Sequence, residues 1–139
     1  MNKRWGAALA GLLCMLVLSA CSRGQVMDGE DMVRKTYTPI SQEKAREMME
    51  EEENCIIVDV RRQDEFETGH IPGAVCIPNE TIEEEAPAEL PDPDQIILIY
   101  CRSGNRSRQA AEKLASLGYA NVYEFGGIND WTGEIVTEE

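Results

Sequence analysis

The chain has 139 residues, the length of one ordinary domain, and its 42% hydrophobic and 28% charged content is that of a globular protein. Its 26 Asp and Glu outnumber its 13 Lys and Arg, and the formal net charge of −13 argues strongly against nucleic-acid binding, which needs a basic surface. The single histidine, His70, leaves no material for a His-rich metal site or for a Cys–His couple that does not use it. We therefore expect no metal ion and no cofactor, and we expect any chemistry to depend on cysteine.

The first twenty residues have the pattern of an export signal. Lys3 and Arg4 precede an apolar run, Trp5–Leu18, which is shorter than the ~20 residues of a membrane-spanning helix. The following Leu-Ser-Ala-Cys sequence, which ends at Cys21, resembles the bacterial lipobox. That resemblance implies a lipoprotein signal peptide over 1–20, cleavage before Cys21 and lipidation of its thiol. A plain cleaved signal or an uncleaved anchor, with Cys21 incidental, is the alternative.

These features predict a protein that is exported and held by lipid at the outer face of the bacterial cell membrane, or on the periplasmic side if the host has two membranes. The polar residues 21–36 have no hydrophobic periodicity, so we interpret them as a flexible tether. The folded domain then occupies residues 37–139 and retains Cys55, Cys76 and Cys101. These three cysteines are too far apart in sequence for a CxxC redox motif or a zinc site.

Apolar segments alternate with amphipathic ones throughout the domain. Cys55–Val60 is a nearly continuous apolar run, typical of a strand covered on both faces, and Ile96–Tyr100 is the most apolar segment and predicts the central strand. Ser41 is a good N-cap for a first helix, and Gly118 ends the last one. In chain order we predict strands at 37–40, 55–60, 74–77, 96–100 and 122–125, and helices after Ser41, at 64–67, around Ile82 and at 106–117.

This alternation predicts an α/β fold, with a central, mainly parallel five-stranded sheet flanked by helices. In such folds the ligand site lies at the carboxyl ends of the strands. The segment Cys101–Ser107 occupies that position, because it follows the central strand and opens a helix. Successive backbone N–H groups in such a turn can surround an anion, the helix directs its positive end at the same point, and Arg102 and Arg106 add charge. All of these features favour the thiolate form of Cys101.

The chain resembles a single-domain rhodanese, a member of the sulfurtransferase superfamily. Besides the Cys101 loop, the matching stretches are Ile57–Arg61, Gly69–Ala74, and Gly126–Ile128 followed by Trp131. The similarity extends from about Tyr37 to Trp131, which is nearly the whole domain. It implies the rhodanese-like fold and a cysteine that accepts a sulfane sulfur from a donor such as thiosulfate and passes it, as a persulfide, to cyanide or a thiol.

By this resemblance Cys101 is the catalytic residue, and the following residues form the substrate cup. Arg102 and Arg106 are candidates for binding a dianionic donor, although either could instead pair with surface carboxylates. The pattern also implies that Asp59 and Arg61 support the loop through a buried ion pair and hydrogen bonds. His70 belongs to the Gly69–Ala74 turn, and we expect it to order the loop without acting as a general base. The substrate-binding residues predicted from the loop are Arg102, Ser103, Gly104, Asn105, Arg106 and Ser107.

Two other functions compete with this one. Cysteine phosphatases and arsenate reductases need a Cys-x5-Arg loop, but here the sixth residue after Cys101 is Ser107, and Arg106 comes one position early. The other alternative is a persulfide carrier, or a docking or sensing module, with little activity on thiosulfate. Cys55 and Cys76 fall on apolar strands, and we expect both to be small buried hydrophobic residues.

Overall fold

The computed structural model describes residues 36–138. The predicted signal peptide, the predicted lipidation site Cys21 and nearly all of the predicted tether lie outside these residues. Within the described part of the chain, no helix is both long enough and apolar enough to cross a membrane.

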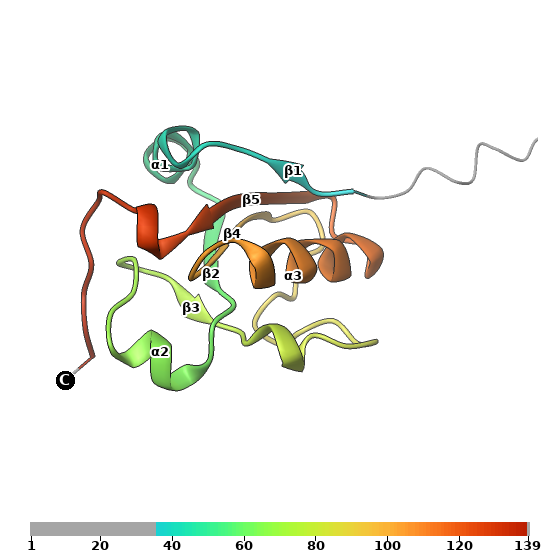
Figure 1. The fold of residues 1–139 in the computed structure, drawn as a ribbon. Helices are drawn as coiled ribbons and strands as arrows, with labels where there is room; N and C mark the ends of the chain where they lie inside the picture. Colours follow the sequence, from blue (N-terminus) through green and yellow to red (C-terminus); the bar gives the residue numbers. More distant parts are fainter. Residues whose placement is uncertain (1–35, 139) are drawn as a thin grey trace, which may run out of the picture. The chain divides into compact units, whose positions relative to one another are not determined.

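The domain contains one five-stranded sheet with the strand order β1-β5-β4-β2-β3, in which all neighbouring strands run parallel (Figure 1). The predicted central strand is confirmed, since β4 lies between β5 and β2. The edge strand β1 contains Pro39, which has no N–H to donate and is tolerated at an edge. The strands are β1 (Thr38–Pro39), β2 (Cys55–Asp59), β3 (Val75–Cys76), β4 (Ile96–Cys101) and β5 (Asn121–Gly127).

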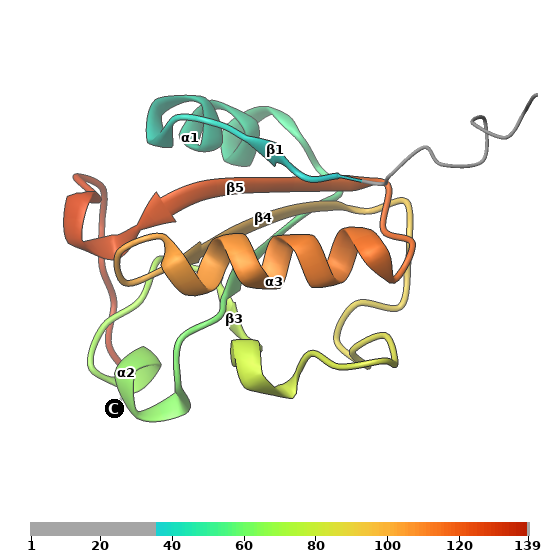
Figure 2. The same cartoon turned by 45° about the vertical axis from the view of Figure 1, so that its right-hand side comes forward.

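Two longer helices lie on opposite sides of the sheet (Figures 1 and 2). The helix α1 (Gln42–Glu51) begins after Ser41, whose side-chain oxygen accepts a hydrogen bond from the Lys44 N–H at 3.0 Å, so the predicted N-cap is confirmed. The helix α3 (Asn105–Ser116) follows β4 directly. Shorter elements are α2 (Gln63–Glu67) and the 3-10 turns Asn79–Thr81 and Ile128–Asp130.

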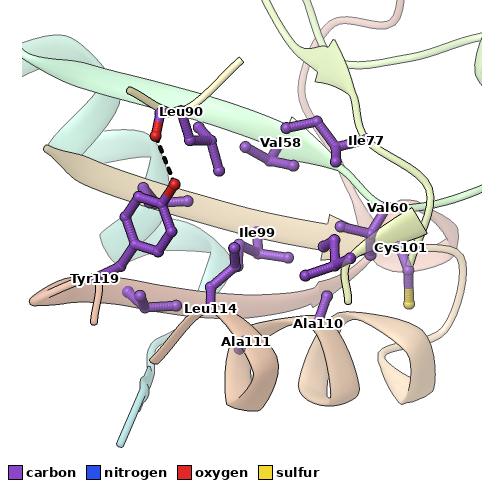
Figure 3. Packing of buried hydrophobic residues seen from close by; sticks show 13 residues of the cluster. Val58, Val60, Ile77, Leu90, Ile99, Cys101, Ala110, Ala111, Leu114 and Tyr119 are labelled. Atoms are coloured by element: carbon purple, nitrogen blue, oxygen red, sulfur yellow. Dashed lines mark hydrogen bonds between the residues drawn. The ribbon is translucent and has the colours of Figure 1, made fainter. Parts of the chain in front are cut away.

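The side chains of β4 alternate between two separate cores, as strand geometry requires. Ile97, Ile99 and Cys101 belong to the cluster that includes Ala110, Ala111 and Leu114 of α3, shown in Figure 3. Leu98 and Tyr100 belong to the other cluster, together with Ala45 and Met48 of α1. The register of β4 therefore places Cys101 on the α3 side of the sheet, where that helix begins.

The helix predicted around Ile82 is wrong. The chain forms only the 3-10 turn Asn79–Thr81, after which Ile82 is buried and residues 83–95 contain no helix or strand. The acidic residues after Ile82 offer no apolar stripe that a helix could bury, and the prolines that follow interrupt the helical hydrogen bonds. The segment is held instead by a hydrogen bond that Tyr119 Oη donates to the Leu90 carbonyl at 2.5 Å (Figure 3).

Candidate active site

Cys101 is the last residue of β4, and the turn that follows it returns the backbone to its sulfur. Gly104 has φ 107°, in the left-handed region that favours glycine, and precedes the first residue of α3. In this conformation the Gly104 N–H donates a hydrogen bond to Cys101 Sγ at 3.0 Å. The sulfur thus has a backbone donor on the loop side, as the sequence predicted.

The amino terminus of α3 begins at this same turn. The first N–H groups of any α-helix lack intrahelical partners, and Gly104 has no side chain that could cap them. Together with the positive end of the helix dipole, they favour an anion in front of the helix. Figure 3 shows Sγ pointing away from the other labelled side chains of its cluster. Cys101 is only 1% exposed, so its sulfur has almost no direct contact with solvent.

A buried carboxylate behind the loop was not predicted from the sequence. Glu124 of β5 is 6% exposed, and its Oε1 accepts hydrogen bonds from Ser107 Oγ at 2.6 Å and from the Gly126 N–H at 2.8 Å. Ser107 Oγ is itself 3.4 Å from Cys101 Sγ. One signal was available: Glu124 lies two residues after Val122 in a strand, so the two side chains share a face that faces the core.

The end of β5 also fixes the position of the loop backbone. A Cβ added at Gly127 would overlap the Arg102 carbonyl and come within 2.7 Å of Ser103 Cα. The Arg102 carbonyl accepts a further hydrogen bond from the Asn129 N–H at 3.1 Å. Only glycine at position 127 allows this close approach of the loop to β5.

The two arginines of the loop have different surroundings. Arg106 forms a bidentate ion pair with Glu65 of α2, with N–O distances of 2.7 and 3.0 Å, which is the carboxylate pairing that the sequence left open as an alternative. The hydrogen bonds from Arg106 hold the pKa of Glu65 at about 2. Arg102 is exposed and, within residues 36–138, forms no ion pair. Ser103 and Asn105 are also exposed, with the Asn105 Oδ1 accepting from Arg108 Nη2 at 2.6 Å.

The predicted ion pair of Asp59 and Arg61 is present and buried, with an N–O distance of 2.7 Å. Arg61 Nη2 also donates to the Gly69 carbonyl at 2.7 Å, so the pair joins the end of β2 to the turn that contains His70. Asp59 is the register partner of Tyr100, the residue before Cys101. The pair therefore supports the loop indirectly, through the end of β4.

The remaining predicted residues lie apart from this loop. The His70 ring stacks on Phe66 with 3.7 Å between centroids, and its Nδ1 lies 2.9 Å from the Phe66 carbonyl, in keeping with an ordering role. Cys55 and Cys76 are only partly buried, which corrects the expectation of full burial. Even this partial burial removes water that would stabilise a thiolate, and it is the main reason that the pKa of each thiol is raised to about 11.

The sequence profile of the rhodanese-like domain family matches residues 41–134, well over half of the chain. The chain belongs to this family. The parallel sheet flanked by helices is the fold of this family, and solved rhodanese structures resemble the domain. One described as a rhodanese with anions from E. coli has a TM-score of 0.56 and 31% identity, and the match covers 60% of this chain and 99% of the other.

Two relatives show which activities occur among similar rhodanese-like proteins. The Bacillus subtilis protein YrkF, whose name places it among sulfur carrier proteins, is 40% identical over 96 residues, covering 68% of this chain and 51% of YrkF. The thiosulfate sulfurtransferase PspE of E. coli is 34% identical over 73 residues, covering 52% of this chain and 70% of PspE. The chain thus spans about half the length of the first relative.

Proposed function

We propose that this rhodanese-like domain is a sulfurtransferase that carries a sulfane sulfur on Cys101, taking it from a donor such as thiosulfate and passing it to cyanide or a thiol. The observation that supports this proposal is the position of Cys101 Sγ, 3.0 Å from the Gly104 N–H in front of α3. A sulfur that accepts a backbone hydrogen bond at a helix N-terminus is stabilised as an anion, and the thiolate is the nucleophilic form of cysteine.

The reaction then proceeds in two nucleophilic steps. The Cys101 thiolate attacks the outer sulfur of thiosulfate, a new S–S bond forms, and sulfite leaves with the electron pair of the broken bond. The Gly104 N–H and the free N–H groups of α3 stabilise the negative charge on the terminal persulfide sulfur. In the second step cyanide or a thiolate attacks that sulfur, and the Cys101 thiolate leaves.

Arg102 is the cation we assign to the donor anion. Its side chain is exposed and forms no ion pair among the described residues, whereas Arg106 is paired with Glu65. The same pairing weighs against a phosphatase or arsenate reductase, because Arg106 is turned toward α2 and Ser107 occupies the position where that chemistry needs arginine. A loop with few free cations suits the transfer of a single sulfur atom better than the binding of a tetrahedral oxyanion.

A persulfide carrier or docking module is the second candidate. The name of YrkF and the low exposure of Cys101 favour it, since a buried sulfur restricts the donors that can reach it. The two candidates share the Cys101 persulfide and differ in the donor: a carrier takes sulfur from a protein or small persulfide and turns over thiosulfate poorly.

The test is a substrate panel with the full chain. We expect thiocyanate to form from thiosulfate and cyanide, and we expect no hydrolysis of an aryl phosphate. Sulfur uptake from a persulfide donor without thiosulfate turnover would favour the carrier. Phosphate release, or no sulfur transfer from any donor, would contradict the proposal.

We also propose that the protein is an exported lipoprotein, with lipid on Cys21. The argument is the order of charged, apolar and small residues before Cys21, together with a net charge of −13, which opposes binding to anionic lipid head groups without an acyl anchor. Expression in a bacterium with labelled palmitate should label the wild type in the membrane fraction and should not label Cys21→Ser. Equal labelling of both would contradict the assignment.

A further inference from the structure

The hydroxyl group of Ser107 lies between the reactive sulfur and a buried carboxylate. Ser107 is fully buried, with Oγ 3.4 Å from Cys101 Sγ and 2.6 Å from Glu124 Oε1. The three groups come from three consecutive elements, β4, α3 and β5, so the fold itself brings them together. Glu124 takes no part in the two transfer steps.

The ionisation of Cys101 is linked to that of Glu124 through the single hydroxyl proton of Ser107. A serine hydroxyl has one proton, and Ser107 Oγ has three acceptors within reach: Glu124 Oε1 at 2.6 Å, the Gly104 carbonyl at 3.0 Å and the Gly126 carbonyl at 3.3 Å. The carboxylate is the nearest and the only charged one, so it takes that proton. In this arrangement Ser107 Oγ presents a lone pair to Cys101 Sγ, and the sulfur is a thiol that donates to it. In the opposite arrangement Glu124 holds the proton, and the Ser107 hydroxyl is free to donate to a thiolate.

We propose that Glu124 is a positioning residue that sets the ionisation of Cys101 by accepting its proton through Ser107. The S–H proton moves to Ser107 Oγ while the hydroxyl proton moves to Glu124 Oε1, leaving a thiolate and a neutral carboxylic acid. This inference rests on the proposed function, because it describes how the Cys101 nucleophile of that reaction is generated and restored.

The electrostatics of the site favour one shared proton. Two adjacent buried anions repel each other and lose hydration, so a thiolate beside an ionised Glu124 is unfavourable, whereas either one-proton arrangement carries a single negative charge. Two cations lie near this charge. Arg106 interacts electrostatically with Cys101. The Nη1 atom of Arg108 lies next to Gly104, 3.8 Å from the position that a Cβ would take there. The helix α1 contributes an uncharged side chain at this end of β5: Gln42 Nε2 donates a hydrogen bond to the Gly127 carbonyl at 2.8 Å.

The test follows the thiolate of Cys101 directly, by its ultraviolet absorbance as a function of pH. Subtracting the curve of Cys101→Ser from that of the full wild-type chain removes the other cysteines and the tyrosines. We expect two steps in the wild type, because a pair that shares one proton titrates with two macroscopic transitions. Glu124→Gln should give one step, and Glu112→Gln, a change at an exposed glutamate of α3, should give two.

Infrared spectroscopy supplies a second signature. A protonated carboxylic acid band should be present in the wild type between the two steps and absent from both Glu124→Gln and Cys101→Ser. Ser107→Ala, which removes only the intervening hydroxyl, should slow persulfide formation at neutral pH by about a hundredfold. A single thiolate step in the wild type, no such band, or an unchanged rate in Ser107→Ala would overturn the proposal.

These outcomes are distinct from failure of the proposed function. The wild-type titration uses no sulfur donor and no variant at position 124, so it remains decisive even if Glu124→Gln does not fold. Two steps without sulfur uptake would support the shared proton and contradict sulfur transfer. Sulfur uptake together with a single thiolate step would support sulfur transfer and contradict the shared proton.

Discussion

Cys76 and Cys101 are the final residues of two parallel strands of the same sheet, yet their surroundings differ in the groups that face each sulfur. Cys76 Sγ donates to the Arg61 carbonyl at 3.5 Å, so its sulfur faces an acceptor. Cys101 Sγ contacts Ser107 Oγ at 3.4 Å and in addition accepts from the Gly104 N–H at 3.0 Å, so its sulfur also faces a backbone donor. An acceptor stabilises the thiol and a donor stabilises the thiolate. If Cys101 is the nucleophile, as we propose, the turn that follows it distinguishes it from Cys76, because both cysteines end a strand.

The residues after each cysteine explain this difference. Cys76 is followed by Ile77 and Pro78, and the Ile77 N–H donates to the Asp59 carbonyl, so this chain leaves the sheet without turning its amides toward the sulfur. After Cys101, Gly104 allows the turn back and α3 begins at once. The pKa of Cys76 is raised to about 11, mainly because burial disfavours the thiolate, so Cys76 is a thiol at neutral pH.

The largest expected effect comes from exchanging the sulfur of each cysteine for oxygen. Cys101→Ser should abolish thiocyanate formation, because serine forms no persulfide. Cys76→Ser should retain activity within about twofold, since a substitution away from the reacting atoms removes no transition-state contact. Residual transfer in Cys101→Ser, or its loss in a folded Cys76→Ser variant, would reverse the assignment of the two cysteines.

Moving the loop of Cys101 should have the next largest effect. In Gly127→Ala the new Cβ overlaps the Arg102 carbonyl, so the loop must shift away from β5. Overpacking of this kind costs about 1–3 kcal/mol, and we expect unfolding in denaturant to show that loss together with a transfer rate at least about tenfold lower. Gly73→Ala is the control for sulfur transfer: at φ 82° it also strains the backbone and costs stability, but its Cβ meets nothing within 4 Å and so does not displace the loop. Wild-type rates in Gly127→Ala would show that the loop position does not matter.

Alkylation compares the two sulfurs in one sample. Only the thiolate reacts, so labelling of Cys76 by iodoacetamide should rise about tenfold per pH unit from neutral pH and level off only near its pKa of about 11. Cys101 should be labelled first at neutral pH, which peptide mapping by mass spectrometry would measure. Preferential labelling of Cys76 at neutral pH would contradict the comparison.

The smallest effect concerns the ion pair between Arg106 of the Cys101 loop and Glu65 of α2. The pKa of Glu65 is lowered from 4.5 to about 2, so the pair contributes stability that is fully present above pH 4.5 and lost as pH falls toward 2. Glu65→Gln should therefore be less stable than the wild type at pH 6 by about 1 kcal/mol, because the two side chains are still 30% and 25% exposed and solvent screens their attraction. Urea unfolding should show this gap closing between pH 4.5 and 2. A gap that widens on acidification would show that Glu65 acts differently.

The sequence predicted those features that follow from local pattern. The continuous apolar run at Ile96–Tyr100 required a strand buried on both faces, and a cysteine directly after it, followed by glycine and a helix, placed the reactive loop correctly. The error around Ile82 has the opposite origin, because three glutamates suit an exposed helix by propensity but supply nothing for it to bury.

The contacts of the loop residues could not be predicted, because they depend on segments far away in sequence. Arg106 pairs with Glu65, 41 positions earlier, and Ser107 contacts Glu124, 17 positions later. Local pattern identifies Arg106 as a cation near the sulfur but gives no information on which carboxylate meets it. With 26 Asp and Glu in the chain, an ion pair with Arg106 is easy to expect, but the composition does not specify which carboxylate forms it.

Intact mass of the full chain after incubation with thiosulfate tests the central claim most directly. The account predicts the gain of one sulfur atom, mapped by peptide analysis to Cys101 and removed by cyanide. A protein that gains no sulfur, or one that carries it on Cys55 or Cys76, would contradict it.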